Sequence, residues 1–288
     1  MSTTTISIRA YSFIVLWLAL LLTVQGCAQS TKDHDFSKPD KTYAVEKGLK
    51  EISGLAWYKK DHFVTIQDED GEIYIYDLSK KDVIEKIKFT KNGDYEDIAI
   101  VGKKIYVLRS DGTLFKVKDL GDKDQETKKY KTALDEGNDT EGLCYDKKND
   151  RLLILCKDDP GKKLKGKRAI YSWDLKKKEL SKKPVFTIKV EEVKEKLLEQ
   201  GIKINDFRPS GIDVHPINNK IYVIASAGKA MVVLDKKGKV EVVHPLDKTL
   251  FEQPEGICFM ANGDLLISNE GKKKKGNILL FKNNATLE

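Results

Sequence analysis

The 288-residue sequence has little of the side-chain chemistry that metal-dependent and nucleophilic enzymes most often use. It contains four histidines and four cysteines, and none of the histidines falls within the repeated motif described below. A Gly-x-Ser-x-Gly motif, which carries the nucleophilic serine of α/β-hydrolases, is also missing. A zinc site, a histidine-assisted lactonase-type reaction and a serine nucleophile of that kind are therefore not expected.

Long apolar runs and concentrated positive charge are missing as well. The apolar run of residues 14–24 is shorter than the ~20 residues that a membrane-spanning helix needs. The net charge of +7 is modest for a chain in which 34% of the residues are charged. Its lysine runs lie in expected hairpin loops, where charge keeps sheet edges from pairing, and aromatic residues do not accompany them. Nucleic acid is therefore not an expected partner.

The first residues have the features of a secretory signal, because Arg9 precedes the apolar run and Gly26-Cys27 follows it. The sequence Val24-Gln25-Gly26-Cys27 resembles a bacterial lipobox. It predicts a lipoprotein-type signal peptide over residues 1–26 and lipidation of Cys27, with an ordinary cleaved signal or a single membrane anchor as the alternatives. Residues 27–41 are polar and should form a flexible tether between the lipid and the domain.

Lipidation of Cys27 would anchor the protein to a membrane of the bacterial cell envelope, with the outer membrane favoured and the domain facing the periplasm or the cell surface. It would also leave three thiols, an odd number that cannot all form disulfides. We expect Cys144, Cys156 and Cys258 to be buried and free, because they lie in or at the end of apolar runs.

A short motif occurs five times: Glu or Ser, then Gly or Asp, then Ile or Leu, at the start of an apolar run. Its second residue is Gly54, Asp97, Gly142, Gly211 and Gly256, so the copies are 43, 45, 69 and 45 residues apart. Each copy begins a series of short segments with strand character, bounded by Gly, Asn, Asp or Lys. Repeats of this length made of strands are typical of a β-propeller.

The repeats predict an all-β protein, a propeller of five four-stranded blades over residues 42–288, with six blades as the alternative. The fifth repeat has only three strands, and residues 41–48 can supply the missing outer strand and close the ring. The long interval of 69 residues contains apolar residues at helical spacing from Val190 onward, followed by Gly201. We therefore expect a helical insertion near residues 190–201.

The repeat also predicts a site. In an antiparallel hairpin the start of the first strand lies beside the end of the second, so two sets of residues should surround one mouth of the central channel. The first set is the first residue of each motif: Ser53, Glu96, Glu141, Ser210 and Glu255. The second set follows the second strands: Asp68, Arg109, Lys157, Asp158, Asn269 and Glu270.

Three carboxylates near one axis repel each other unless a cation compensates them. Oxygen-rich sites suit Ca²⁺, so we hypothesise a calcium ion held by Glu96, Glu141 and Glu255, with support from Asp68, Asn269 and Glu270. Arg109 and Lys157 are rival sources of positive charge. Alternatively, each Glu binds backbone N–H groups of a neighbouring blade and has a structural role.

Several segments together resemble the SdiA-regulated family of bacterial propeller proteins, among them EISGLAW, NDTEGLCYD, RPSGIDVH and QPEGICFMANGDLLISNEG. The resemblance extends over roughly residues 42–282 and implies a secreted or membrane-tethered propeller with a metal-binding centre on one face. It implies no particular reaction, because a fold is compatible with many functions.

The sequence leaves two candidate functions. The first is a monomeric binding lipoprotein whose cation-bearing face takes an unidentified protein, peptide, glycan or small molecule. The second is a Ca²⁺-dependent hydrolase, phytase-like or lactonase-like, in which the metal activates water. A phosphoesterase should place several basic residues beside its metal, and only Arg109 and Lys157 do so here. Binding is therefore favoured.

Overall fold

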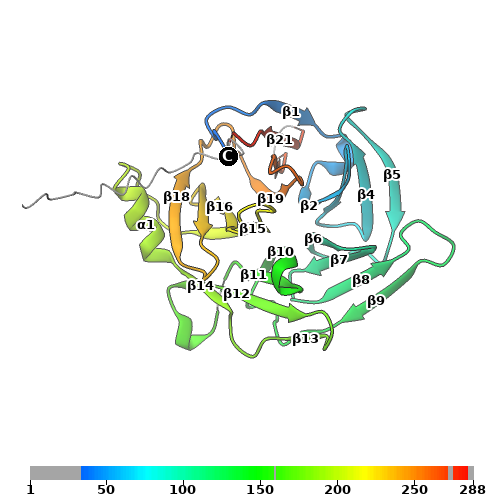
Figure 1. Cartoon of the computed structure of the whole chain (residues 1–288), viewed down its shortest axis with the longest axis horizontal. Helices are drawn as coiled ribbons and strands as arrows, with labels where there is room; N and C mark the ends of the chain where they lie inside the picture. The colour runs from blue at the N-terminus through cyan, green and yellow to red at the C-terminus, as the bar shows by residue number, and fades with distance from the viewer. Residues whose placement is uncertain (1–33, 159, 272–274, 285–288) are drawn as a thin grey trace, which may run out of the picture. The chain divides into compact units, whose positions relative to one another are not determined.

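The five repeats fold as five antiparallel sheets arranged around a common centre (Figure 1). This is seen in a computed structural model that describes residues 34–158, 160–271 and 275–284. The first sheet contains β2 (Ile52–Lys59), β3 (His62–Gln67), β4 (Glu72–Asp77) and β5 (Asp82–Lys88). The second contains β6 (Tyr95–Val101), β7 (Lys104–Arg109), β8 (Leu114–Lys118) and β9 (Glu126–Tyr130).

The other three sheets follow the same order from the centre outward. The third contains β10 (Thr140–Asp146), β11 (Arg151–Cys156), β12 (Lys167–Asp174), β13 (Glu179–Leu180) and β14 (Phe186–Lys189). The fourth contains β15 (Arg208–Val214), β16 (Ile221–Ala227), β17 (Ala230–Leu234) and β18 (Val240–Pro245). The fifth contains β19 (Pro254–Phe259), β20 (Leu265–Asn269), β21 (Asn277–Phe281) and β1 (Lys41–Ala44).

The predicted five-bladed propeller is confirmed, including the closure of its ring. Strand β1 pairs antiparallel with β21, with Lys41 opposite Leu280, so a segment from before the first repeat completes the last blade. The helix α1 (Val190–Leu198) lies where the insertion was expected and buries Val193 and Leu197. Three short 3-10 helices lie in connecting segments: η1 (Lys47–Leu49), η2 (Lys147–Asn149) and η3 (Lys162–Leu164).

The outer part of the third blade differs from the expected four strands. Two short strands, β13 and β14, pair with β12 in place of a single fourth strand. Lys182, Lys183 and Pro184 lie between them. Proline cannot donate a hydrogen bond to a neighbouring strand, which accounts for the interruption.

The apolar core is divided among the boundaries between blades. The third residue of each motif is at most 2% exposed, and each belongs to a different hydrophobic cluster. These five residues are Leu55, Ile98, Leu143, Ile212 and Ile257. Burial of one such side chain contributes roughly 1.5–3 kcal/mol, so the motif holds neighbouring blades together as well as defining each inner strand.

The motif also forms a β-bulge in every inner strand. In β6, for example, Tyr95 pairs with Arg109 and Asp97 with Leu108, which leaves Glu96 without a partner across the sheet. Pairing shifts at the corresponding place in β2, β10, β15 and β19. A bulge redirects the extra residue's side chain, and such irregularities are frequent beside functional sites.

Two buried aspartates bind the inner strands to each other. Asp97 accepts a hydrogen bond from the backbone N–H of Leu143 in the next blade at 2.6 Å. Asp213 accepts one from the backbone N–H of Phe259, again in the next blade, at 2.7 Å. These contacts provide the structural role that the sequence analysis considered for the motif glutamates.

The first described residues lie on the domain. His34 is 3% exposed, and its Nε2 is 2.8 Å from the carbonyl oxygen of Gly263 in the turn between β19 and β20. The Phe36 ring lies 5.6 Å from that of Phe281. The end of the expected tether, residues 34–40, is therefore part of the folded unit. The predicted signal peptide and Cys27 lie outside the described residues.

Candidate functional site

Three glutamates and one lysine form the centre of the candidate site, which we call the acidic mouth: Glu96, Glu141, Glu255 and Lys157. The glutamates occupy the bulges of β6, β10 and β19, and Lys157 follows β11. Lys157 Nζ lies 2.5 Å from Glu141 Oε1 and 3.8 Å from Asp139 Oδ2. Lys157 therefore compensates part of the acidic charge, as one of the two rival cations named from the sequence.

The glutamates are held in an environment that disfavours their ionised form. Burial raises the pKa of Glu141 to about 7, against the opposing effect of Lys157. Burial, and then the charge of Glu141, raises the pKa of Glu255 to about 8. Burial, followed by Glu141 and Asp94, raises the pKa of Glu96 well above its usual range. A cation placed among these groups would stabilise their ionised form.

The second rival cation does not reach the glutamates. Arg109 makes a bidentate contact with Asp111, with distances of 3.0 Å from Nε and 2.5 Å from Nη2. This ion pair turns the guanidinium toward the loop after β7 and lowers the pKa of Asp111 to about 2. Arg109 is thus close to the mouth in the fold but is neutralised by a residue of its own blade.

A third set of polar residues surrounds the mouth and was missed in the sequence analysis. They lie two positions before the first motif residue: Glu51, Asp94, Asp139, Arg208 and Gln253. Four of the five come directly before their inner strand, so the constant distance from the motif was a usable signal. Arg208 Nη2 lies 2.6 Å from Asp158 and 3.6 Å from Asp139, which places the predicted residue Asp158 in an ion pair.

The remaining predicted residues of the metal set lie at the boundary between the fifth and first blades. Asp68 follows β3, Asn269 ends β20, and Glu270 accepts a hydrogen bond from the side chain of Gln253. Burial, followed by the charges of Glu51, Glu69 and Glu270, raises the pKa of Asp68 to about 6.

Two oxygens in this group are buried without a donor. Within the described part of the chain, neither Asp68 Oδ1 nor Asn269 Oδ1 has a hydrogen-bond partner. Asn269 itself is fully buried, and its Nδ2 donates to Asn277 Oδ1 at 3.1 Å. Leaving a buried acceptor unpaired costs about 1–3 kcal/mol, so such atoms are candidates for a ligand or ion.

The two motif serines have other roles. Ser210 Oγ donates to the carbonyl oxygen of Pro254 at 2.6 Å and so joins the fourth blade to the fifth. Ser53 is 5% exposed, and its carbonyl oxygen accepts a hydrogen bond from Ser268 Oγ at 2.7 Å, which joins the fifth blade to the first. No hydrogen bond between the motif glutamates and a neighbouring blade's backbone is present among the described residues. Serines and aspartates hold the ring, and the glutamates are available for another role.

Carboxylate and amide oxygens at these positions are the ligand types that Ca²⁺ prefers. Among residues 34–158, 160–271 and 275–284, no three His, Cys, Asp or Glu side chains form a ready-made metal cluster. The raised glutamate pKa values fit a cation at the acidic mouth, where Glu96, Glu141 and Glu255 are the residues that would hold it. The two buried acceptor oxygens belong to the supporting residues Asp68 and Asn269. No helix in the part of the chain described here is long and apolar enough to cross a membrane.

Comparison with protein families gives a match over most of the chain. The model of the family described as SdiA-regulated matches residues 33–273. The chain belongs to the SdiA-regulated family. The match includes all five motifs of this SdiA-regulated protein, together with every residue of the acidic mouth. No curated protein matches its sequence.

Solved structures share the fold of this SdiA-regulated protein at low identity. A glutaminyl cyclase from Myxococcus xanthus has a TM-score of 0.57 and 15% identity, with 85% of this chain and 95% of that chain covered. A luciferin-regenerating enzyme has a TM-score of 0.52 and 11% identity, over 86% and 96% of the two chains. At such identity the likeness concerns the fold alone.

Proposed function

We propose that this protein is an envelope-anchored binding protein, tethered through a lipid on Cys27, that takes a cation at the acidic mouth. The observation that carries the proposal is a group of three glutamates with raised pKa values, Glu141 buried and the other two half-buried, and a single lysine among them. A bound cation would stabilise their carboxylates, and calcium is the ion that this oxygen-rich chemistry favours. A held cation could then join a protein, peptide, glycan or small-molecule partner to this face.

Binding is favoured over hydrolysis because the basic residues near the mouth are already in ion pairs with carboxylates. Lys157 contacts Glu141, Arg109 contacts Asp111, and Arg208 contacts Asp158. A phosphoester would have to displace these carboxylates before any of the three cations could neutralise its charge. A Ca²⁺-dependent hydrolase remains the second candidate, because the metal itself could activate water.

Calorimetric titration of the metal-stripped protein with CaCl₂ tests the proposal. We expect a heat of binding, a rise in melting temperature and release of protons near pH 7, since Glu141 and Glu255 ionise on binding. Glu141→Gln and Asp68→Asn should weaken binding about ten-fold or more, whereas Glu85→Gln on the exposed outer strand β5 should not. Absence of both heat and melting shift at millimolar calcium would show the cation proposal to be wrong.

The enzymatic alternative needs a separate assay. The protein is incubated with phosphoesters and lactones in the presence of calcium, beside Glu141→Ala as the control. We expect no turnover above the variant. Turnover that the substitution abolishes would replace binding with hydrolysis as the function of the site.

The anchor is tested by fractionation of cells. The wild-type protein should sediment with membranes, and Cys27→Ser should be released into the soluble fraction because it removes the only acceptor of the predicted lipid. An unchanged distribution of the variant contradicts lipid anchoring while leaving the calcium titration unaffected.

A further inference from the structure

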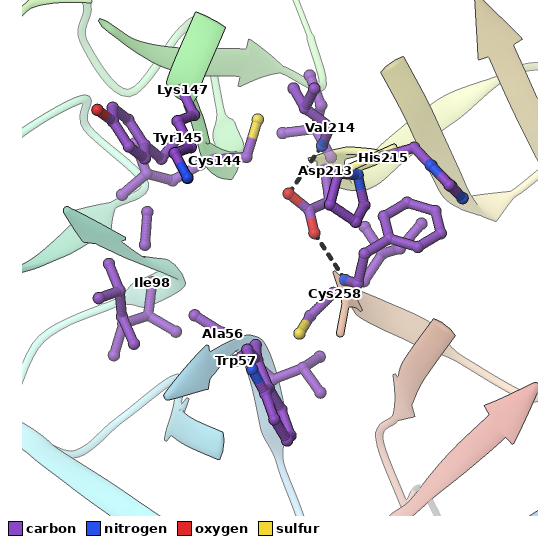
Figure 2. Close-up of a pocket in the computed structure, with 18 of the residues that line it drawn as sticks. Ala56, Trp57, Ile98, Cys144, Tyr145, Lys147, Asp213, Val214, His215 and Cys258 are labelled. Atoms are coloured by element: carbon purple, nitrogen blue, oxygen red, sulfur yellow. Dashed lines mark hydrogen bonds between the residues drawn. The ribbon is translucent and has the colours of Figure 1, made fainter. Parts of the chain in front are cut away.

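A cavity of about 670 Å³ lies at the opposite end of the inner strands from the acidic mouth (Figure 2). All five inner strands contribute to its wall through the residues that follow the motif. The sequence analysis assigned no role to this end of the propeller. Its volume lies within the range of pockets that hold small ligands.

Most of the residues that line the cavity are apolar or aromatic, and polar atoms supply almost half of its exposed surface. Trp57, Ile98, Tyr145, Val214 and Phe259 line it, one from each blade. Figure 2 shows such side chains arranged around an open centre. Surfaces of this kind bind the apolar part of a ligand, since their contact with the ligand removes water from both.

Two thiols and one carboxylate complete the wall. Burial raises the pKa of Cys144 and Cys258 well above the usual range, so both stay neutral and behave as small hydrophobic groups. Asp213 is the one carboxylate among the lining residues that the structure describes. Its oxygens already accept the backbone N–H groups of Val214 and Phe259 at 2.7 Å each. These two thiols and this carboxylate therefore offer little to a strongly polar ligand.

Lysines outnumber aspartates in the turns at the cavity end of the inner strands, which also carry Asp61, Asp150 and Asp264. Lys147 and Lys148 line the cavity on η2, and both are exposed. The turns after β2 and β6, at the same end of the inner strands, carry four more exposed lysines: Lys59, Lys60, Lys103 and Lys104. None of the six makes an ion pair with a described residue. Lysines without partners around an apolar cavity are complementary to an anionic head on an apolar body.

The chain enters the domain at this same end. His34 binds the Gly263 carbonyl, and its ring lies 6.3 Å from that of His215, which lines the cavity. Cys27 precedes His34 by seven residues, so an extended chain keeps the two within about 25 Å. The proposed lipid anchor, if present, is therefore attached to the domain at the cavity end.

We propose that the cavity binds the apolar chain of an anionic amphiphile, a fatty acid or an anionic phospholipid, while the surrounding lysines bind its acidic head. The apolar wall recognises the chain, and Lys147 and Lys148 recognise the carboxylate or phosphate. The binding site is separate from the acidic mouth and does not require calcium. Only the argument from the position of the anchor rests on the function proposed above.

Tryptophan fluorescence with dodecanoate brominated on its chain tests the proposal, because bromine quenches tryptophan only at close range. The protein used begins at residue 27 and carries Cys27→Ser, so that it is handled without lipid or detergent; residues Lys32–Glu288 form one compact unit containing every hydrophobic cluster described above. We expect saturable quenching of Trp57. Trp57→Phe should remove most of it, since Trp173, the other tryptophan in the protein that begins at residue 27, is buried in the third blade.

Charge reversal at the entrance provides the matched comparison. Lys147→Glu with Lys148→Glu should raise the dodecanoate Kd about ten-fold or more, whereas Lys176→Glu with Lys177→Glu should leave it unchanged. The second pair makes the same charge change on exposed residues of the turn between β12 and β13, away from the cavity lining. Equal quenching in both double variants, or no quenching in the wild type, would overturn the proposal.

The source of the amphiphile is distinguished with vesicles. Protein without its lipid is sedimented with phosphatidylcholine vesicles, with or without phosphatidylglycerol, using chain-brominated lipid as the quencher. Quenching by the anionic vesicles supports a membrane phospholipid, and quenching by free dodecanoate alone supports a free acid. Glu141→Gln should bind dodecanoate normally, so loss of calcium binding and loss of amphiphile binding are separate results.

Discussion

At the scale of single residues, the acidic side chains of this propeller divide into two groups with different consequences. Asp97 and Asp213 accept backbone N–H groups and stabilise the contact between blades. Burial raises the pKa in both groups, to about 7 for Asp213 and Glu141 and to about 8 for Glu255, but Glu141 and Glu255 lack such backbone donors. The N–H groups offset part of the cost of burying the aspartates, whereas the glutamates lack this compensation and provide a site for a cation.

The variant Glu255→Gln tests how much a motif glutamate lowers the free energy of unfolding. The pKa of Glu255 is raised in the folded protein, so the folded state binds more protons than the unfolded state between about pH 4.5 and 8, and stability falls as pH rises through that window. Replacing Glu255 with glutamine should remove this fall. We expect the free energy of unfolding in metal-free buffer to rise by about 1 kcal/mol at pH 8 and to change little at pH 4.5, by urea denaturation. A loss of stability at pH 8 contradicts this account.

Asp97→Asn tests the first group. An asparagine has one acceptor oxygen and one NH₂ group, so it cannot accept from both Leu143 and Ile98, whose N–H groups lie 2.6 and 2.8 Å from the Asp97 oxygens. One of these two buried N–H groups would then face the NH₂ group of the asparagine, which is also a hydrogen-bond donor. We expect a loss of about 1–3 kcal/mol in unfolding free energy. Asp124→Asn, at an exposed position in the turn between β8 and β9, should change it by less than about 0.5 kcal/mol.

At the scale of elements, the inner strand is the unit that makes both the fold and the site. Its bulge places an extra residue in each blade, and the next residue approaches the neighbouring blade closely. A Cβ atom on Gly211 would lie 2.5 Å from the carbonyl oxygen of Glu255, so glycine is required by space rather than by an unusual backbone angle. The motif's Gly is therefore a requirement of blade packing.

Gly211→Ala should accordingly be costly. The clash is with a backbone oxygen, which cannot move aside without shifting β19, so we expect a loss of about 2 kcal/mol or more in unfolding free energy. Gly48→Ala is the matched control, because its nearest neighbour is the flexible end of Lys86 at 3.2 Å. Similar stability of the two variants in urea denaturation would show that the bulge can relax.

Sequence reasoning succeeded where a repeated pattern supplied the information. The motif spacing predicted the blades, and the three strands of the fifth repeat predicted its outside partner. The side-chain partners of the site residues were harder to predict from the sequence. Whether Lys157 or Arg109 would meet the glutamates depends on the local loop, and Asp111, two residues after Arg109, decides it.

At the scale of the whole molecule, the propeller has a candidate site at each end, and the sequence indicated only one. The acidic end is visible in the sequence because its residues belong to the motif. The cavity is formed by residues one and two places beyond the motif, such as Ala56, Cys144 and Cys258, which appear in the sequence as ordinary apolar strand positions. Only the closed ring brings five such strands together around a space.

Ring closure can be tested by deletion. Removing residues up to 45 takes away β1, together with Tyr43 and Val45, which are 4% and 1% exposed. The edge of β21 would then be open, and part of one hydrophobic cluster would meet water. We expect aggregation or loss of a single cooperative unfolding transition, measured by size-exclusion chromatography and calorimetry. Removing residues 1–33 should leave both properties intact, and equal behaviour of the two truncations would contradict the closure.

The pairing of β1 with β21 also orders events during synthesis. Lys41 and Leu280 are about 240 residues apart, so one of the first strands to leave the ribosome finds its partner only when nearly the whole chain has been made. Until then Tyr43 stays unburied. A chain that terminates early therefore remains recognisable to proteases and chaperones by an unpaired strand at its beginning, whichever blade it stops in.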